Sequence, residues 1–136
     1  MKFIAPILCA LAGLVIAAPQ PTTTNTARDA QNGQLTYFAT GLGACGVTNQ
    51  ETDSIVAIDH QTFDSGNVDG NPNHNRNCGR VIRITQANYK TVSKDVTVVD
   101  RCEACQPGDL DVTRTIFGGL APVESGRVQL SWHWLT

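Results

Sequence analysis

The sequence predicts an all-β fold of one small domain that is cross-linked by disulfide bonds. Short runs of β-branched and aromatic residues recur along the chain between Gly, Asn, Asp and Pro, and no helix-length stretch shows a 3.6-residue period. The chain is long enough for one hydrophobic core and too short for two. The expected strands cover residues 35–40, 54–58, 80–85, 94–99 and 128–134.

Two short helices are expected between these strands. One covers residues 60–64 and the other residues 113–118, where Asp111 or Thr113 could cap the start and the pair Gly118-Gly119 would end it. The segment 64–78 is dominated by Asn, Gly, Asp, Pro and His, whose side chains bond their own backbone, so a loop is expected there.

The first residues are typical of a secretory signal peptide. Lys2 supplies the positive start, an apolar run extends to Ile16, and small alanines follow. A membrane anchor is the alternative, but it needs roughly 20 apolar residues and this run stops earlier, at Pro19. We expect a signal peptide over 1–17, a disordered Thr-rich tether over 18–32 that is open to O-glycosylation, and the folded domain over 33–136.

Charge and motif content exclude several classes of partner. The formal net charge is −2 and no basic run occurs, so nucleic acid and anionic membrane surfaces are unlikely partners, because both need a clustered positive field. The chain contains no flavin or nucleotide fingerprint, and no cofactor is expected. We expect a secreted, extracellular monomer.

The cysteines indicate an oxidising compartment. Cys9 falls in the predicted signal peptide, which leaves four cysteines with three possible pairings: Cys45, Cys78, Cys102 and Cys105. A zinc site is the alternative, but a single CxxC provides only half of a four-cysteine site, so no metal is expected.

Several motifs occur in a recognisable order. They are GxLTYFxTGLGACG from Gly33, IVAIxH from Ile55, NCG from Asn77, VVDRCxxC from Val98, DLDV from Asp109 and WxW from Trp132. Together they resemble the double-psi β-barrel family, in its rare-lipoprotein-A-like, barwin and expansin group, and most of all the small fungal single-domain expansin-like proteins called loosenins. The resemblance implies a six-stranded barrel with an open groove for polysaccharide or peptidoglycan. It also implies the disulfides Cys45–Cys78, as in barwin, and Cys102–Cys105.

The resemblance places a candidate acid at Asp111. Its DLDV setting matches the segment that carries the essential aspartate of expansins and the proton donor of family 45 endoglucanases. Such a carboxyl needs a partly apolar wall, which raises its pKa so that it can protonate a glycosidic oxygen. Capping of the helix at 113–118 is the alternative role. Asp100 would be a second carboxylate in the same groove, or else a partner of Arg101 or of turn amides.

Other residues match groove positions of the family less strongly. Thr36 and Tyr37 lie in the first strand, where alternation allows only one of them on each face, and Thr36 is the better match. His60 stands where rare-lipoprotein-A-like proteins often carry a histidine, although a lone surface histidine commonly has no role. Trp132 and Trp134 share one face of the last strand, where they would either stack on sugar rings or, as we favour, fill the core.

One departure from the family bears on activity. Ala39 stands where family 45 endoglucanases carry the general base, so efficient hydrolysis is not expected. The resemblance therefore favours a protein that binds cell-wall polysaccharide (cellulose, chitin or peptidoglycan) and loosens it without cutting. Small barrels of this group that inhibit papain-like cysteine proteases provide one alternative. A weak endoglucanase or lytic transglycosylase that uses Asp111 as its acid is another.

Overall fold

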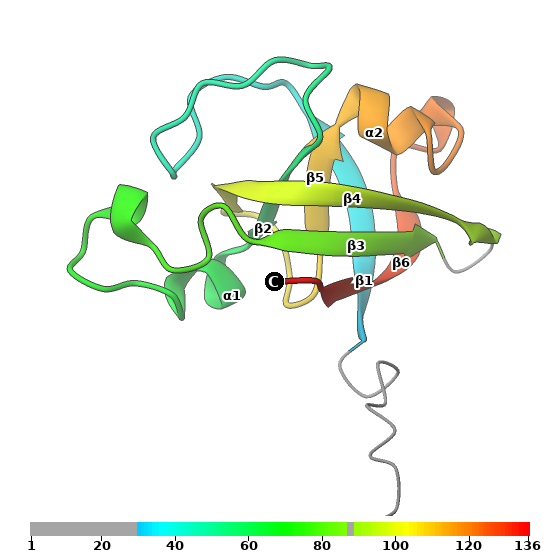
Figure 1. Ribbon diagram of the computed structural model, residues 1–136. Coiled ribbons are helices and arrows are strands. Elements are labelled where there is room, and N and C mark those ends of the chain that lie inside the picture. The colour runs from blue at the N-terminus through cyan, green and yellow to red at the C-terminus, as the bar shows by residue number, and fades with distance from the viewer. Residues whose placement is uncertain (1–29, 87–88) are drawn as a thin grey trace, which may run out of the picture.

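The computed structural model describes residues 30–86 and 89–136, and these form a closed barrel with the strand order β1-β5-β2-β4-β3-β6 (Figure 1). The predicted signal peptide and nearly all of the predicted tether lie outside the described residues. The prediction of a mostly β, six-stranded barrel with two short helices is confirmed. No helix among residues 30–86 and 89–136 is long and apolar enough to cross a membrane.

The barrel mixes parallel and antiparallel pairs. Strand β1 is parallel to β5 and β2 is parallel to β4, whereas the other four pairs are antiparallel. The strands are β1 (Gln31–Phe38), β2 (Ile55–Asp59), β3 (Val81–Gln86), β4 (Tyr89–Cys102), β5 (Leu110–Thr113) and β6 (Val128–Trp134).

Strand β6 has the predicted bounds, β2 and β3 are each shifted by one residue, and the other three strands differ more. Strand β1 begins at Gln31, inside the range assigned to the tether, because residues 31–34 pair with β6 even though they carry no large apolar side chain. Strand β4 is longer than predicted at both ends. Strand β5 was not predicted from the residues, because four residues with Asp111 among them show too short an alternation to stand out.

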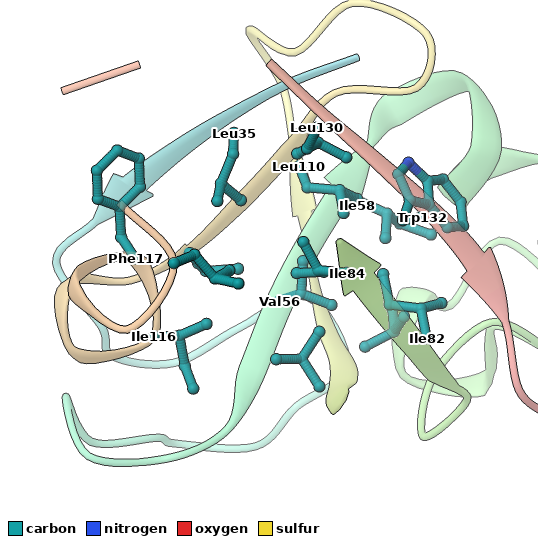
Figure 2. Packing of buried hydrophobic residues seen from close by; sticks show 14 of the residues in the cluster. Leu35, Val56, Ile58, Ile82, Ile84, Leu110, Ile116, Phe117, Leu130 and Trp132 are labelled. Atoms are coloured by element: carbon teal, nitrogen blue, oxygen red, sulfur yellow. The ribbon is translucent and has the colours of Figure 1, made fainter. Parts of the chain in front are cut away.

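Alternation along the strands fills the barrel. One face of each strand points inward and carries β-branched or large apolar side chains, which meet in a single cluster (Figure 2). The cluster's fully buried members include Leu35, Val56, Ile58, Ile82, Ile84, Leu110, Val112, Phe117, Leu130 and Trp132. The outward-facing side chains of the same strands are therefore the ones that a ligand can contact.

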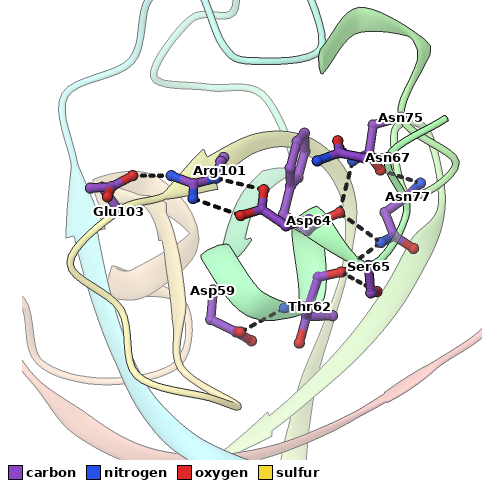
Figure 3. Close-up of polar contacts among 10 residues, drawn as sticks. Asp59, Thr62, Asp64, Ser65, Asn67, Asn75, Asn77, Arg101 and Glu103 are labelled. Carbon is purple, nitrogen blue, oxygen red and sulfur yellow. Dashed lines mark hydrogen bonds and ion pairs between the residues drawn. The ribbon is translucent and has the colours of Figure 1, made fainter. Parts of the chain in front are cut away.

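Both helices begin with a side-chain cap. Helix α1 (His60–Asp64) starts at Asp59, whose Oδ1 accepts a hydrogen bond of 2.9 Å from the backbone N–H of Thr62 (Figure 3). Helix α2 (Arg114–Gly118) starts at Thr113, whose Oγ1 accepts one of 3.1 Å from the N–H of Ile116. Of the two predicted caps for α2, Thr113 takes this role, which leaves Asp111 free for another.

Two long connections project from the barrel and are fastened to each other. A disulfide joins Cys45 in the connection 39–54 to Cys78 at the end of the connection 65–80, and a second joins Cys102 to Cys105. Both pairings agree with those that the family resemblance implied. In the connection 65–80 the side-chain amides of Asn75 and Asn77 donate to backbone carbonyls of α1 (Figure 3). The same connection contains one turn of 3₁₀ helix, η1 (Pro72–His74). A second such turn, η2 (Val123–Ser125), precedes β6.

Candidate functional site

Four residues from four adjacent strands form a row across the outside of the barrel. The register pairs Thr36 of β1 with Asp111 of β5, Asp111 with Ala57 of β2, and Ala57 with Asp100 of β4. Laterally paired residues point to the same face of a sheet, and the sequence neighbours of these residues in β1, β2 and β5 belong to the core. We call Thr36, Asp111, Ala57 and Asp100 the carboxylate row.

Asp111 is the chemically distinctive member of the carboxylate row. The hydroxyl of Thr36 donates a hydrogen bond of 2.8 Å to its Oδ1. Burial raises the pKa of the Asp111 carboxyl above 3.8, the hydrogen bond from Thr36 and the charge of Arg127 oppose that rise, and the charge of Asp100 adds to it. The carboxyl is therefore placed to hold a proton at a higher pH than an ordinary aspartate.

Asp100 is held by backbone amides. Its Oδ1 accepts hydrogen bonds of 2.8 Å from the N–H of Ala44 and from the N–H of Arg101. The guanidinium of Arg101 instead makes a two-point contact with Asp64 and also contacts Glu103 (Figure 3). The predicted bond to turn amides is therefore present alongside the predicted placement near Asp111, and the salt bridge with Arg101 is not made.

Gly43 allows the loop that holds Asp100 to sit against the barrel. A Cβ at this position would lie 2.4 Å from the carbonyl oxygen of Val99 and 3.2 Å from the Cβ of Asp100. The next two N–H groups, of Ala44 and Cys45, bond to Asp100 and Val99 respectively. The connection 39–54 thus forms one wall of the carboxylate row.

Tyr37 lies on the opposite face of β1 from Thr36, as alternation predicts. Its ring packs edge-on against Phe117 of α2 with centroids 5.0 Å apart, and its hydroxyl donates to the carbonyl of Val123 at 3.4 Å. It also lines a hollow of about 230 Å³ at the end of β1, together with Phe38, Ala39, Glu51 and Arg114. Tyr37 is therefore not part of the carboxylate row, although it remains partly accessible next to it.

The two tryptophans have different environments. Trp132 is 1% exposed, and its indole N–H donates to the carbonyl of Gly108 at 2.9 Å. Trp132 therefore fills the core, as favoured from the sequence, and the alternative of stacking on sugar rings is wrong for this residue, because a ring enclosed in the core cannot stack on a ligand. Trp134 is half-buried, and the guanidinium carbon of Arg80 lies 3.6 Å from the centre of its ring.

His60 lies away from the carboxylate row. It begins α1 three residues beyond Ala57, which corresponds to roughly 10 Å along an extended strand. Its Nδ1 is buried and has no hydrogen-bond partner among the described residues. A contact between His60 and a ligand stays a prediction.

Arg127 and Glu51 are site neighbours that the sequence did not reveal. Arg127 directly precedes Val128, which pairs with Leu35, so it lies next to Thr36 at one end of the carboxylate row. Glu51 lies in the hollow beside Ala39 and accepts the N–H of Arg114 at the start of α2. Both come from loops, where no periodic pattern assigns a residue to a face. No group of three His, Cys, Asp or Glu side chains that could hold a metal occurs within the described parts of the chain.

Comparison with solved structures gives the same architecture. The chain superposes on the Streptomyces papain inhibitor with a TM-score of 0.68 and 27% identity, covering 79% of this chain and 94% of that one. It superposes on the expansin of Clavibacter michiganensis with a TM-score of 0.62 and 19% identity, covering 79% of this chain and 50% of that one. The chain is a double-psi β-barrel protein. Another structure of that expansin, a point mutant, is a complex with cellohexaose.

Sequence comparison finds relatives of this double-psi β-barrel in fungi and bacteria. The chain is 35% identical to Allergen Asp f 7 of Aspergillus fumigatus over 109 residues, which is 75% of this chain and 36% of that protein. It is 28% identical to the papain inhibitor of Streptomyces mobaraensis over 132 residues, which is 95% of this chain and 88% of the inhibitor. It thus spans about a third of the length of the allergen. No family model matches the chain.

Proposed function

We propose that this protein is exported, binds a cell-wall glycan across the carboxylate row, and loosens contacts between glycan chains without efficient hydrolysis. The observation that carries the proposal is the partly buried Asp111 carboxyl, which has a raised pKa and is oriented by Thr36. The fold shared with an expansin that has been solved with cellohexaose supports the same type of ligand. The two disulfides agree with an oxidising, extracellular compartment.

The chemistry of the carboxylate row suits binding better than cutting. A protonated Asp111 donates a hydrogen bond to a glycan oxygen, and Asp100, fixed by two amides, accepts one from a glycan hydroxyl. Inverting hydrolysis also needs a carboxylate that activates water on the other side of the sugar. Ala39 has no carboxylate, so Asp111 can act as an acid but has no general base at position 39 to activate water.

A binding and release assay tests this proposal. The mature protein is incubated with insoluble cellulose, chitin or peptidoglycan, and bound protein and soluble sugar are measured in the same tubes. We expect binding to at least one polymer with little sugar release, and at least ten-fold weaker binding for Asp111→Ala, which removes the hydrogen-bonding group. Asp69→Ala, which removes an exposed carboxylate paired with His74, is the matched control and should bind like the wild type.

Other outcomes of this assay would redirect the proposal. Release of reducing sugar would indicate a weak endoglucanase and make Glu51, the carboxylate beside Ala39, the first residue to change. Release of anhydro-sugar products from peptidoglycan would indicate a lytic transglycosylase with Asp111 as its acid. Absence of binding to all three polymers would refute the glycan proposal.

Inhibition of a papain-like cysteine protease is a second candidate function. The similarity to the Streptomyces papain inhibitor, which extends over most of both chains, favours it. A rigid loop would carry this function, and Leu42, 74% exposed on the connection 39–54, is the best-placed apolar contact. Titration of papain tests this candidate: Leu42→Asp should weaken inhibition, whereas Val68→Asp and Asp111→Asn should not. No inhibition by the wild type would eliminate it.

A further inference from the structure

The barrel carries a second concave surface that contains no member of the carboxylate row. It is an open hollow of about 550 Å³ between the connection 39–54 and the outer face of β2 and β4, and we call it the valine hollow. Its lining is mostly apolar and includes Val47, Ile55, Val98, Val99 and the Cys45–Cys78 disulfide. The volume is within the range of 300–1,000 Å³ that is usual for small-molecule sites.

The walls of the valine hollow are fixed in the absence of a ligand. The loop that forms the outer wall is closed on itself by hydrogen bonds of 3.0 Å from Gly43 N–H to Val47 and from Asn49 N–H to Gly41. It is also joined to the opposite wall by the disulfide and by the N–H of Cys45, which bonds to Val99 at 3.0 Å. A site built this way binds with little ordering cost, because its loop does not have to be immobilised by the ligand.

The apolar wall lies partly open to water. Val47 is 49% exposed and, with Leu42, Val68 and Leu135, is one of four exposed large hydrophobic side chains among the described residues. Contact with water is unfavourable for such a surface, at about 25 cal/mol per Å² of apolar area, so covering it with an apolar ligand is favourable.

One corner of the hollow is polar and contains the side chains of Asn49 and Asp53. The amide of Asn49 donates from Nδ2 to Oδ2 of Asp53 at 3.4 Å, and the same Oδ2 accepts the N–H of Gln50 at 2.9 Å. Oδ1 of Asn49 is buried and has no hydrogen-bond partner among the described residues, and within the same residues Oδ1 of Asp53 accepts no hydrogen bond. A ligand donor could satisfy the unpaired oxygen of Asn49 if the side chain rotates and exchanges its bond to Asp53 for one to the ligand.

We propose that the valine hollow binds a small amphipathic molecule with an apolar ring or aliphatic body and a head group that donates hydrogen bonds, such as a hydroxyl or an ammonium. The apolar body covers Val47, Ile55 and Val99, and the head group reaches Asn49 and Asp53. The carboxylate of Asp53 disfavours an anionic head group, because a like charge there would be repelled. This site is independent of the proposed glycan function, since none of its residues belongs to the carboxylate row.

Three naphthalene probes of one shape and different head groups test the proposal at pH 7. They are 2-naphthol, 2-naphthylmethylamine and 2-naphthoate, and binding is followed by shifts in the backbone amide signals of Val47, Ile55 and Thr97. We expect the hydroxyl and the ammonium probes to shift these signals and to bind at least about ten-fold more tightly than the carboxylate, a difference of about 1.4 kcal/mol.

Two variants and a matched control locate the site. Val47→Asp should weaken the hydroxyl probe about ten-fold or more, and Val68→Asp, which changes a valine of similar exposure at 55% on the other long connection, should leave it unchanged. Asp53→Asn keeps an acceptor for Gln50 but removes the charge, so it should weaken the ammonium probe more than the hydroxyl probe.

Three results would overturn the proposal. The first is the absence of shifts at Val47, Ile55 and Thr97 with every probe, which would leave the hollow to a partner's side chain or to no ligand. The second is equal binding of all three head groups. The third is an equal effect of Val47→Asp and Val68→Asp. None of these results bears on glycan binding, which the Asp111→Ala assay measures separately.

Discussion

Three neighbouring groups set the protonation behaviour of Asp111. Burial raises the pKa of its carboxyl, the Thr36 hydroxyl lowers it by bonding to the charged form, and the Arg127 guanidinium acts in the same direction through its charge. Asp100 lies across Ala57 and works against both of these lowering effects. The acid character of Asp111 therefore depends on residues from four different segments of the chain.

Removal of the Thr36 hydroxyl should raise the pKa of Asp111 further. In Thr36→Val the carboxylate loses the 2.8 Å hydrogen bond that stabilises its charged form, whereas Thr36→Ser retains it. Carbon-detected NMR titration of the Asp111 carboxyl measures both variants. An unchanged titration midpoint in Thr36→Val would show that this hydrogen bond does not hold the carboxylate in solution.

The raised pKa of Asp111 also predicts a pH-dependent stability effect. The folded chain retains a proton at pH values where the unfolded chain has lost it, so Asp111 favours folding less as the pH rises from 3.8 through its folded pKa. Asp111→Asn should therefore be more stable than the wild type at pH 7, with the advantage shrinking towards pH 4. Denaturant unfolding across this range measures it.

Asp69→Asn provides the control for this stability measurement. The pKa of Asp69 is lowered by its hydrogen bond with His74, so loss of that carboxylate should bring no gain in stability at pH 7. Lower stability of Asp111→Asn at pH 7 would contradict the burial of an unfavourable charge at this site.

At the level of elements, the two disulfides constrain loops of very different length. Cys45–Cys78 spans 33 residues of sequence and Cys102–Cys105 spans 3. Loss of the long-loop bridge in Cys45→Ala/Cys78→Ala should cost about 4 kcal/mol of unfolding free energy, and loss of the short-loop bridge about 2 kcal/mol, because a longer loop restricts the unfolded chain more. Denaturant unfolding of the two double variants tests the order, and equal losses would refute this account.

The close packing of the connection 39–54 against β4 depends on Gly43. Gly43→Ala should cost about 1–3 kcal/mol, because its Cβ would lie 2.4 Å from the carbonyl oxygen of Val99. The amide signal of Ala44 should also shift as its bond to Asp100 lengthens. Gly41→Ala is the control on the same loop, since a Cβ there meets nothing within 4 Å, and it should change stability by less than about 0.5 kcal/mol.

The elements that could be predicted are those with a local signal. Strand β6 matches its predicted bounds because apolar and polar residues alternate along it, and α1 matches because Asp59 and the residues after it provide a start. Strand β5 carries too few residues for any period to show, and only the family resemblance indicated the sixth strand. Trp132 could not be separated from Trp134 by alternation alone, since both lie on one face and only Trp132 is fully enclosed.

At the level of the whole molecule, the candidate site is a product of strand register. Thr36 and Asp111 are 75 residues apart in sequence, yet β1 and β5 run in parallel and pair them directly. The resemblance identified Asp111, Asp100 and Thr36 one by one, but no local pattern could predict that Ala57 separates the two carboxylates. No local pattern could predict the position of Arg127 either, because it lies beside the carboxylate row only through the antiparallel pairing of β6 with β1.

Closure of the barrel should depend on a contact between two glycines. A Cβ on Gly33 of β1 would lie 2.2 Å from the carbonyl oxygen of Gly108, and that oxygen accepts the indole N–H of Trp132 while the N–H of Gly108 donates to Asp59. Gly33→Ala therefore pushes apart the segment before β5 and the strand pair β1–β6, and it should cost about 3 kcal/mol.

Unfolding monitored by tryptophan fluorescence tests this, since Trp132 is buried in the folded barrel and becomes exposed when the barrel unfolds. Gly41→Ala is the control for the loss of a glycine as such. A Gly33→Ala variant as stable as that control would mean that the contact between Gly33 and Gly108 tolerates a side chain, and that closure of the barrel depends on strand pairing alone.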